Sequence, residues 1–289
     1  MKIDFLLMNY KGFYVLSKII DNGYRDIINS VISAKDINVV NDYYNDIEQI
    51  CKNYSIRFFD RKNMPQNIVD YKIAIGWRWI IEDYKNLIII HDSLLPKYRG
   101  FAPLASALIN GETSVGATLL LANKEYDKGD IIIQKELVIH YPVKLVRVIE
   151  EISKIYVWLI IEFLKKLQSN SILKGQPQND EMASYSLWRD EEDYRIDWNK
   201  NSGEIHRFID SVGFPYKGAS CLYEGNLIRI HECVEINDVS IVNRISGKIF
   251  LLTNGHPIVV CGKGLLMITH ATNDIGENLE IKSLRTRFQ

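Results

Sequence analysis

The chain has 289 residues, enough for one large domain or two ordinary ones with a sizeable core. Its formal net charge is −1, which argues against a nucleic-acid partner because phosphate-dominated binding requires a basic surface. The four cysteines show no CxxC spacing, and no run approaches about 18 uncharged apolar residues. The amino terminus has an acid inside its short apolar run, unlike a signal peptide. We therefore expect a cytoplasmic protein with free thiols, no metal site and no membrane span.

The first half of the chain alternates between short apolar runs and stretches with helical spacing. Strands are expected at residues 3–8, 27–32, 56–59, 73–76 and 87–90, and helices at residues 13–21, 45–54 and from about 77 onward. This alternation predicts a parallel sheet wrapped by helices, which is a Rossmann-like α/β fold. No GxGxxG motif follows the first strand, so a dinucleotide cofactor is not indicated.

The middle of the chain predicts two more strands and a long helix. The strands, at residues 118–121 and 131–134, bracket a turn, and residues 143–167 form an amphipathic helix that closes the first domain. Residues 176–180 are polar and turn-prone, and are the expected linker. We predict a catalytic domain at residues 1–180 and a smaller β-rich domain at residues 181–289.

The last third predicts a short helix followed by β-type runs. The helix covers residues 201–211 with Ser202 as its N-cap, and strands are expected at residues 227–231, 247–252 and 258–260. Asn254-Gly255 is typical of a hairpin turn. These strands are too few to close a sheet, so we expect a homodimer that covers their edges.

Two dense motifs carry the chemistry. His91 opens the run HDSLLPKYRG (residues 91–100) directly after a predicted strand, where open α/β sheets place their ligands. Asp127 lies 36 residues later, in the run EYDKGDI (residues 125–131). A histidine beside a carboxylate suggests an imidazole whose protonation the carboxylate controls. A structural histidine that caps a strand end is the alternative.

The two motifs together resemble the folate-dependent formyltransferase superfamily, which includes methionyl-tRNA, glycinamide ribonucleotide and sugar N-formyltransferases. The likeness covers residues 76–134, and further matches at 185–193, 196–198 and 207–219 indicate the sugar N-formyltransferase branch. The resemblance implies formyl transfer from N10-formyltetrahydrofolate to a nucleotide-linked amino sugar, with His91 and Asp127 as the catalytic pair. The leading acceptor is dTDP-4-amino-4,6-dideoxyglucose, followed by a dTDP-3-amino-3,6-dideoxyhexose, in O-antigen (lipopolysaccharide) biosynthesis.

One position departs from the family pattern. The family usually has an asparagine two residues before the histidine, and this chain has Ile89. Another polar group, a water or a backbone N–H would have to replace the amide. The departure leaves a second interpretation open, a non-catalytic module that binds folate or a nucleotide sugar. Methionyl-tRNA formylation is a further alternative, which the net charge disfavours.

The resemblance also implies binding residues. For the pteridine these are Trp77, Arg78, Trp79, Leu94, Leu95, Pro96, Lys97, Asn123, Lys124, Glu125, Tyr126 and Asp127. Core packing of the two tryptophans is the alternative. Candidates for the nucleotide sugar are Lys11, Arg78, Arg99 and Arg207 for the diphosphate, Phe214 and Tyr216 for the base, and Asn9 and Tyr10, which follow the first strand and face the crevice. The charge run at residues 189–193 is expected to be a solvated connector.

Overall fold

The computed structural model describes residues 1–65, 68–169 and 174–289 and divides into two compact units. The first unit comprises Met1–Leu104, Thr113–Ile139 and Arg147–Leu187, and the second comprises Ala105–Glu112, His140–Val146 and Trp188–Gln289. Each unit therefore gathers segments that are apart in sequence. The single boundary that we placed between residues 180 and 181 stays a prediction.

The first unit is built on a seven-stranded sheet with strand order β3-β2-β1-β4-β5-β7-β8. Neighbouring strands from β3 to β5 are parallel, while β7 pairs antiparallel with both β5 and β8. The strands are β1 (Ile3–Leu7), β2 (Ile28–Ser33), β3 (Arg57–Asp60), β4 (Tyr71–Ile75), β5 (Leu87–His91), β7 (Ser114–Leu121) and β8 (Ile131–Val138). The predicted Rossmann-like sheet is confirmed, with an antiparallel pair added at one side.

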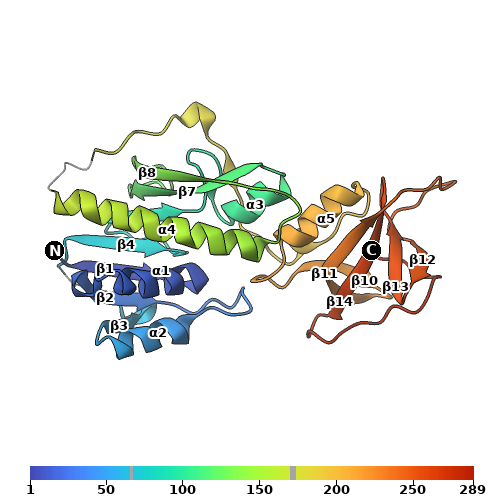
Figure 1. Cartoon of the computed structure of the whole chain (residues 1–289), viewed down its shortest axis with the longest axis horizontal. Coiled ribbons are helices and arrows are strands. Elements are labelled where there is room, and N and C mark those ends of the chain that lie inside the picture. The colour runs from blue at the N-terminus through green and yellow to red at the C-terminus, as the bar shows by residue number, and fades with distance from the viewer. Residues whose placement is uncertain (66–67, 170–173) are drawn as a thin grey trace. The chain divides into compact units, whose positions relative to one another are not determined.

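Helices α1 (Asn9–Asp21) and α4 (Leu145–Gln168) lie on the same side of this sheet (Figure 1). Gly12 brings α1 close to β1, because a Cβ at this position would lie 2.9 Å from the Cβ of Leu7. Helix α2 (Tyr44–Asn53) packs beside α1 and β3, and the chain also forms a short helix α3 (Pro103–Ile109). The close packing of α1 places its amino-terminal residues at the carboxyl end of β1.

Two expectations about helices were wrong. No helix follows Trp77, and residues 77–86 instead form bends and turns. The apolar residues of this stretch do not make a buried stripe, since Ile80 is 85% exposed. Helix α5 (Ser202–Ser211) is capped by Asn201 rather than Ser202. The Asn201 side chain accepts from the backbone N–H of Glu204, and the Glu204 side chain accepts from the backbone N–H of Asn201, which completes a capping box.

The predicted linker at residues 176–180 is tied to the first unit. Gln176 exchanges two backbone hydrogen bonds with Ile131, of 2.8 and 2.9 Å. A few residues later, the strand β9 (Tyr185–Ser186) pairs in parallel with β6 (Arg99–Gly100). We call residues 176–186 the return segment, because they lead the chain back from α4 to the loop that follows His91.

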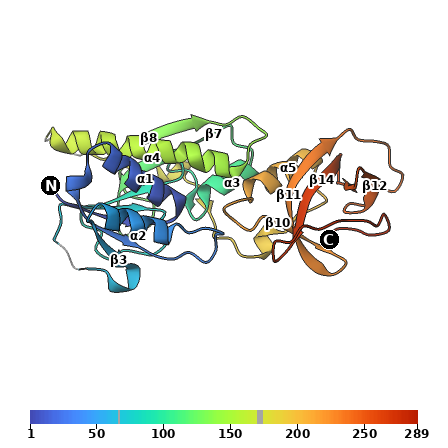
Figure 2. The ribbon, with the colours of Figure 1, turned by 60° about the horizontal axis from the view of Figure 1, so that its bottom comes forward.

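The second unit contains a five-stranded antiparallel sheet (Figure 2). Its strand order is β10-β11-β14-β13-β12. The strands are β10 (Ala219–Tyr223), β11 (Asn226–Ile236), β12 (Ile249–Thr253), β13 (His256–Val260) and β14 (Leu265–Asn273). The side chains of α5 share an apolar core with this sheet. The hairpin turn at Asn254-Gly255 is confirmed, with both residues at positive φ between β12 and β13.

The carboxyl-terminal residues cover the edge that we expected to be open. Gln289 exchanges backbone hydrogen bonds of 3.0 and 2.6 Å with Leu222 of β10. Phe288 donates to the carbonyl of Gly247, and Ile249 of β12 donates to the carbonyl of Thr286. Both edges of the sheet are thus paired in part within the chain. The homodimer itself stays a prediction.

No helix in residues 1–65, 68–169 or 174–289 is long and apolar enough to cross a membrane. Within the same residues, no group of three or more His, Cys, Asp or Glu side chains is placed to hold a metal ion. The four cysteines are free and buried, and burial raises the pKa of the Cys51 and Cys221 thiols to about 12.

Candidate active site

His91 is the last residue of β5 and is only 7% exposed. Its Nε2 lies 2.8 Å from the backbone carbonyl oxygen of Tyr98. A carbonyl oxygen can only accept, so Nε2 must carry a hydrogen. The backbone of the following loop thus fixes the tautomer of the ring. Any proton that the imidazole gains or loses is therefore carried by Nδ1.

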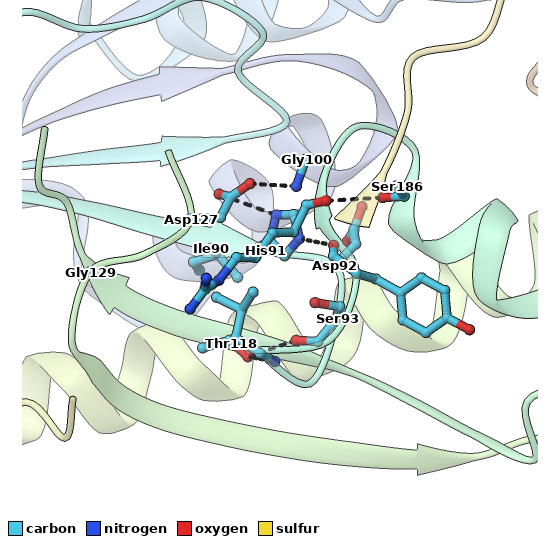
Figure 3. Close-up of polar contacts among 12 residues, drawn as sticks. Ile90, His91, Asp92, Ser93, Gly100, Thr118, Asp127, Gly129 and Ser186 are labelled. Carbon is cyan, nitrogen blue, oxygen red and sulfur yellow. Dashed lines mark hydrogen bonds and ion pairs between the residues drawn. The ribbon is translucent and has the colours of Figure 1, made fainter. Parts of the chain in front are cut away.

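Asp127 faces that second nitrogen. Its Oδ1 lies 3.4 Å from His91 Nδ1, and its Oδ2 accepts a hydrogen bond of 2.9 Å from the backbone N–H of Gly100. Figure 3 shows the carboxylate between the imidazole and Gly100. The structure thus brings together the two residues that the sequence motifs singled out. A proton on Nδ1 would lie between the ring and the Asp127 carboxylate.

Both backbone turns around this pair adopt an uncommon conformation. Asp127 and Tyr98 have φ values of 58° and 57°, in the left-handed region that non-glycine residues rarely occupy. Gly129 is required close by, because a Cβ there would lie 1.5 Å from the carbonyl oxygen of Leu121. Left-handed residues held by their surroundings are frequent at functional sites.

A buried ionic network supports the loop directly after His91. The Asp92 carboxylate pairs with the Lys11 ammonium and accepts a hydrogen bond of 2.6 Å from the Tyr156 hydroxyl. Burial alone would raise the pKa of Asp92, but Lys11 and Tyr156 outweigh it and hold that pKa below its ordinary value. Burial, followed by the nearby Asp92 charge, raises the pKa of Tyr156 well above its ordinary value. The network joins α1 and α4 to Asp92, the residue that directly follows His91 and β5.

Ile89 lies two residues before His91 in β5, so the two side chains point to the same face of the sheet. It packs against an apolar cluster made by Leu6, Ile32, Ala74 and Leu87, to which Trp77 and Ala122 also belong. The position that is usually asparagine in the family is therefore occupied by an apolar side chain among other apolar side chains.

The pteridine candidates fall into two environments. Trp77 packs with the apolar cluster around Ile89, and its ring meets that of Trp79 edge-on at 5.4 Å. Trp79 is 36% exposed and carries the Arg61 guanidinium over its ring at 4.1 Å. For Trp77 the structure thus supports the core-packing alternative. Trp79 keeps an exposed face.

The remaining pteridine candidates flank the pair. Leu95 is buried, and its backbone N–H donates to Thr118 at 3.2 Å. Leu94 contacts Gly116, while Pro96 is half-buried and Lys97 is exposed. The residues before Asp127 form an exposed turn: Asn123, Lys124, Glu125 and Tyr126. Their contact with folate stays a prediction.

Two of the nucleotide-sugar candidates, Asn9 and Arg78, meet at Asp36. The Asn9 side-chain amide and the Arg78 guanidinium both donate to the buried Asp36, at 3.1 and 2.9 Å. The Asn9 Oδ1 atom is buried and has no hydrogen-bond partner among the described residues. Tyr10 packs between the rings of Tyr14 and Tyr43, at 5.7 and 5.5 Å. Asn9 and Arg78 are therefore the candidates that the structure unites.

Two other diphosphate candidates, Lys11 and Arg99, are paired with carboxylates of the chain itself. Lys11 belongs to the ionic network with Asp92. Arg99 has no exposed surface, and its guanidinium pairs with Asp180 at 2.7 Å and with Gln178 at 2.8 Å. The prediction that Arg99 binds phosphate is corrected, because a fully buried and paired guanidinium cannot reach a ligand.

The last three candidates belong to the second unit. Arg207 donates to the carbonyl of Ile109 at 3.0 Å. Phe214 is 45% exposed, and the Tyr216 ring lies 5.9 Å from that of Tyr194. These positions stay predicted nucleotide-sugar contacts.

The charge run at residues 189–193 is not wholly solvated. Glu191 pairs at 2.7 Å with Arg229, a buried arginine of β11 that also pairs with Asp274. The expectation of a solvated connector was therefore wrong for Glu191, which anchors this run to the sheet of the second unit.

Sequence reasoning missed three groups around the pair. The Tyr98 carbonyl was missed because a backbone atom leaves no signal in residue identity. Asp92 directly follows a predicted buried strand. A carboxylate buried there would need a cation as its partner, and this requirement could have pointed to Lys11. Gln178 was assigned to a linker, although its side chain reaches the Asp127 turn.

Comparison with known proteins agrees with this geometry. Residues 68–163 match the family described as "Formyl transferase", and residues 189–289 match "Formyl transferase, C-terminal domain". The first match includes both His91 and Asp127. The chain thus resembles the two domains of the formyl transferases, each over about a third of its length.

Individual relatives fall into two groups. A methionyl-tRNA formyltransferase of Fusobacterium nucleatum is 31% identical over 211 residues, which cover 73% of this chain and 64% of that protein. The chain thus spans less than two thirds of the length of this curated relative. A structure of an N-formyltransferase from Helicobacter canadensis in complex with folinic acid and dTDP-3-aminofucose has a TM-score of 0.68 and 18% identity, covering 96% of this chain and 100% of that chain. A 4-N formyltransferase from Francisella tularensis has a TM-score of 0.57 and 21% identity, covering 76% and 91%. These two structures share the fold.

Proposed function

We propose that this chain transfers the formyl group of N10-formyltetrahydrofolate to the amine of a nucleotide-linked amino sugar. The observation that carries the proposal is the His91–Asp127 pair, in which Nε2 is held by the Tyr98 carbonyl and Nδ1 faces the carboxylate at 3.4 Å. This arrangement places the exchangeable ring proton, on Nδ1, beside the Asp127 carboxylate, which can act as a base. Both matched domains belong to formyl transferases, and we place the reaction in the cytoplasm because the four cysteines are free thiols.

The pair suits each proton step of formyl transfer. The amine nitrogen attacks the formyl carbon, which gives a tetrahedral oxyanion that the His91 imidazolium stabilises. Asp127 takes the proton that the amine loses, and the bond between the formyl carbon and N10 breaks. Nδ1 of His91 gives its proton to the departing N10. Proton return from Asp127 to His91 Nδ1, across 3.4 Å, restores the starting state.

The acceptor is argued from charge and from the Asn9–Asp36–Arg78 cluster. Residues 189–289 contain 12 Lys and Arg against 14 Asp and Glu, a formal charge of −2, and the whole chain carries −1. Such a chain suits a small diphosphate better than a large polyanion. The cluster at the carboxyl end of β1 offers an arginine for the diphosphate. Our leading acceptor is dTDP-4-amino-4,6-dideoxyglucose, as used in O-antigen biosynthesis, and the second is a dTDP-3-amino-3,6-dideoxyhexose.

A second candidate function is methionyl-tRNA formylation, which the sequence relatives favour. It differs from the first in its dependence on salt. A protein that neutralises several phosphates loses about 10³- to 10⁵-fold in affinity between 50 and 200 mM salt, whereas a diphosphate offers far fewer contacts.

The experiment that tests the proposal compares kcat/KM for five acceptors. Four are the 3-amino and the 4-amino sugar, each linked to dTDP or to UDP, and the fifth is charged initiator tRNA. We expect the highest value for the dTDP-linked 4-amino sugar. A tenfold preference for a UDP-sugar or for the 3-amino dTDP-sugar would refute this acceptor but not the reaction. Salt-sensitive formylation of the tRNA alone would establish the second candidate.

A further inference from the structure

The return segment, residues 176–186, contacts the loop that follows His91 and the turn that carries Asp127. Its Ser184 hydroxyl accepts from the backbone N–H of Tyr98 at 2.9 Å, and its Ser186 carbonyl accepts from Phe101 at 3.0 Å. These bonds hold the loop whose carbonyl binds His91 Nε2. The segment is therefore a candidate for aligning the catalytic groups.

Gln178 of this segment reaches the other half. Its side-chain Nε2 donates to the backbone carbonyls of Asp127 and Gly129, each at 2.8 Å. Its Oε1 accepts from the Nε and NH2 groups of Arg99, at 3.1 and 2.8 Å. The amide thus bridges a buried arginine and the turn that carries Asp127.

Arg99 also determines which way the amide faces. A guanidinium has only donors, so the amide oxygen of Gln178 must face Arg99 and the nitrogen must face the two carbonyls. Arg99 is itself immobilised by Asp180 at 2.7 Å and by the Tyr185 hydroxyl at 3.3 Å. The two donors are therefore presented to the turn in a fixed orientation.

The turn needs such support. Asp127 is in the left-handed region, and Gly129 leaves no room for a side chain against Leu121. Within the turn, the hydrogen bond from the N–H of Lys128 to the carbonyl of Glu125 is long, at 3.4 Å. Two bonds from Gln178 onto the carbonyls on either side of Lys128 restrain the backbone from which the Asp127 carboxylate projects.

We infer that Gln178 is a positioning residue that aligns the Asp127 carboxylate with His91 by holding the backbone of its turn. The inference rests on the proposed function for its kinetic part only. It concerns alignment, so losing the two donors should lower kcat and leave KM for N10-formyltetrahydrofolate nearly unchanged. Small misplacements of catalytic groups cost up to about 100-fold in rate.

The test compares Gln178→Ala and Gln178→Glu with Gln176→Ala, a control in the same segment that meets Ile131 through its backbone. Glutamate keeps an oxygen for Arg99 but loses both donors to the turn. We expect kcat to fall about 10- to 100-fold in both Gln178 variants, with KM within about threefold, and to stay unchanged in Gln176→Ala. Wild-type kcat in Gln178→Glu would refute the inference, since the amide would then serve only Arg99.

A spectroscopic readout separates this inference from the proposed function. The Gly100 N–H donates to Asp127 Oδ2, so its amide proton resonance reports on the carboxylate. We expect both Gln178 variants to shift this resonance, and Gln178→Ala to add no shift in an Asp127→Ala background, where no residue-127 side chain accepts from Gly100. An unchanged Gly100 resonance in both variants would overturn the inference. A wild-type chain without formyl transfer would instead overturn the proposed function, whatever the resonance shows.

Discussion

Two polar clusters lie at the carboxyl ends of parallel strands in the first unit, and they are held differently. Around His91 and Asp127, both ring nitrogens and both carboxylate oxygens have partners, and two of those partners are backbone groups. In the cluster of Asn9, Asp36 and Arg78, the buried Asn9 Oδ1 has no partner among the described residues. One cluster is fully arranged by the fold, and the other keeps an unused acceptor.

The difference predicts different roles. A group that is already aligned contributes to the transition state, so its loss should lower kcat. A cluster with an unused polar atom is better suited to binding, and its loss should raise KM with little change in kcat. The predictions that follow test this division.

Loss of either catalytic candidate should have the largest effect. We expect His91→Ala and Asp127→Ala to lower kcat by about 10²- to 10⁴-fold, the range for a general acid or base. Steady-state kinetics with the preferred acceptor measures this loss. His140→Ala, which removes an exposed histidine, is the matched control. Near wild-type kcat in either variant would end the assignment of roles.

Lys11→Met should strongly destabilise the first unit, because it leaves the buried Asp92 without its cation. Breaking one partner of a buried pair costs about 3–5 kcal/mol, measurable by urea unfolding. Lys18→Met, which breaks an exposed pair with Asp21, should cost far less. Equal costs would contradict the account of the Asp92 network.

The same network gives a pH dependence with a definite sign. The pKa of Asp92 is below its ordinary value in the folded protein, so the carboxylate contributes stability above its unfolded pKa, about 3.9. That contribution is lost as the pH falls through the lower, folded value. In Lys11→Met the burial of Asp92 is no longer offset and raises its pKa, so the free-energy gap to the wild type should be widest at high pH and shrink as the pH falls. A gap that grows on acidification would contradict this sign.

Ile89→Asn should separate stability from activity. It places an amide in the apolar cluster with Trp77, where an unsatisfied polar group costs about 1–3 kcal/mol. We expect lower stability with activity retained or raised, because the amide adds a donor on the face of His91. Thermal unfolding and kcat measure the two effects, with Ile89→Val as the control. A folded but inactive Ile89→Asn protein would show that its amide disturbs the pair.

Arg78→Ala should have the smallest effect of this series. We expect KM for the nucleotide sugar to rise about tenfold with kcat unchanged, as for the loss of one hydrogen bond to a charged group. Arg57→Ala, whose guanidinium bonds Asn29 across β2 and β3, is the control. A fall in kcat at unchanged KM would place Arg78 with the catalytic cluster and break the comparison.

Much of the first unit could be predicted because local patterns determine it. The apolar run before His91 forms β5, and Asp127 meets His91 because both motifs adjoin neighbouring strands of one sheet. The sequence could not reveal that Arg99 is buried, because a charged residue becomes internal only when distant partners such as Gln178 and Asp180 enclose it.

The second unit shows the same limit. The Asn254-Gly255 turn was predictable, since its backbone conformation depends on two adjacent residues. The closing of the sheet edge by residues 286–289 was not, because it depends on pairing with Leu222 and Gly247, which are far away in sequence. Long-range pairings leave little trace in the periodicity of either segment.

The central claim is that His91 and Asp127 carry out formyl transfer to an amino sugar. A single-turnover experiment tests it most directly, with enzyme in excess over N10-formyltetrahydrofolate labelled in its formyl group, and dTDP-4-amino-4,6-dideoxyglucose as the acceptor. The account predicts that label moves to the sugar with the wild type, and at least about 100-fold more slowly with Asp127→Asn. Bound folate without label transfer by the wild type would contradict it, and would favour a module that binds without catalysis.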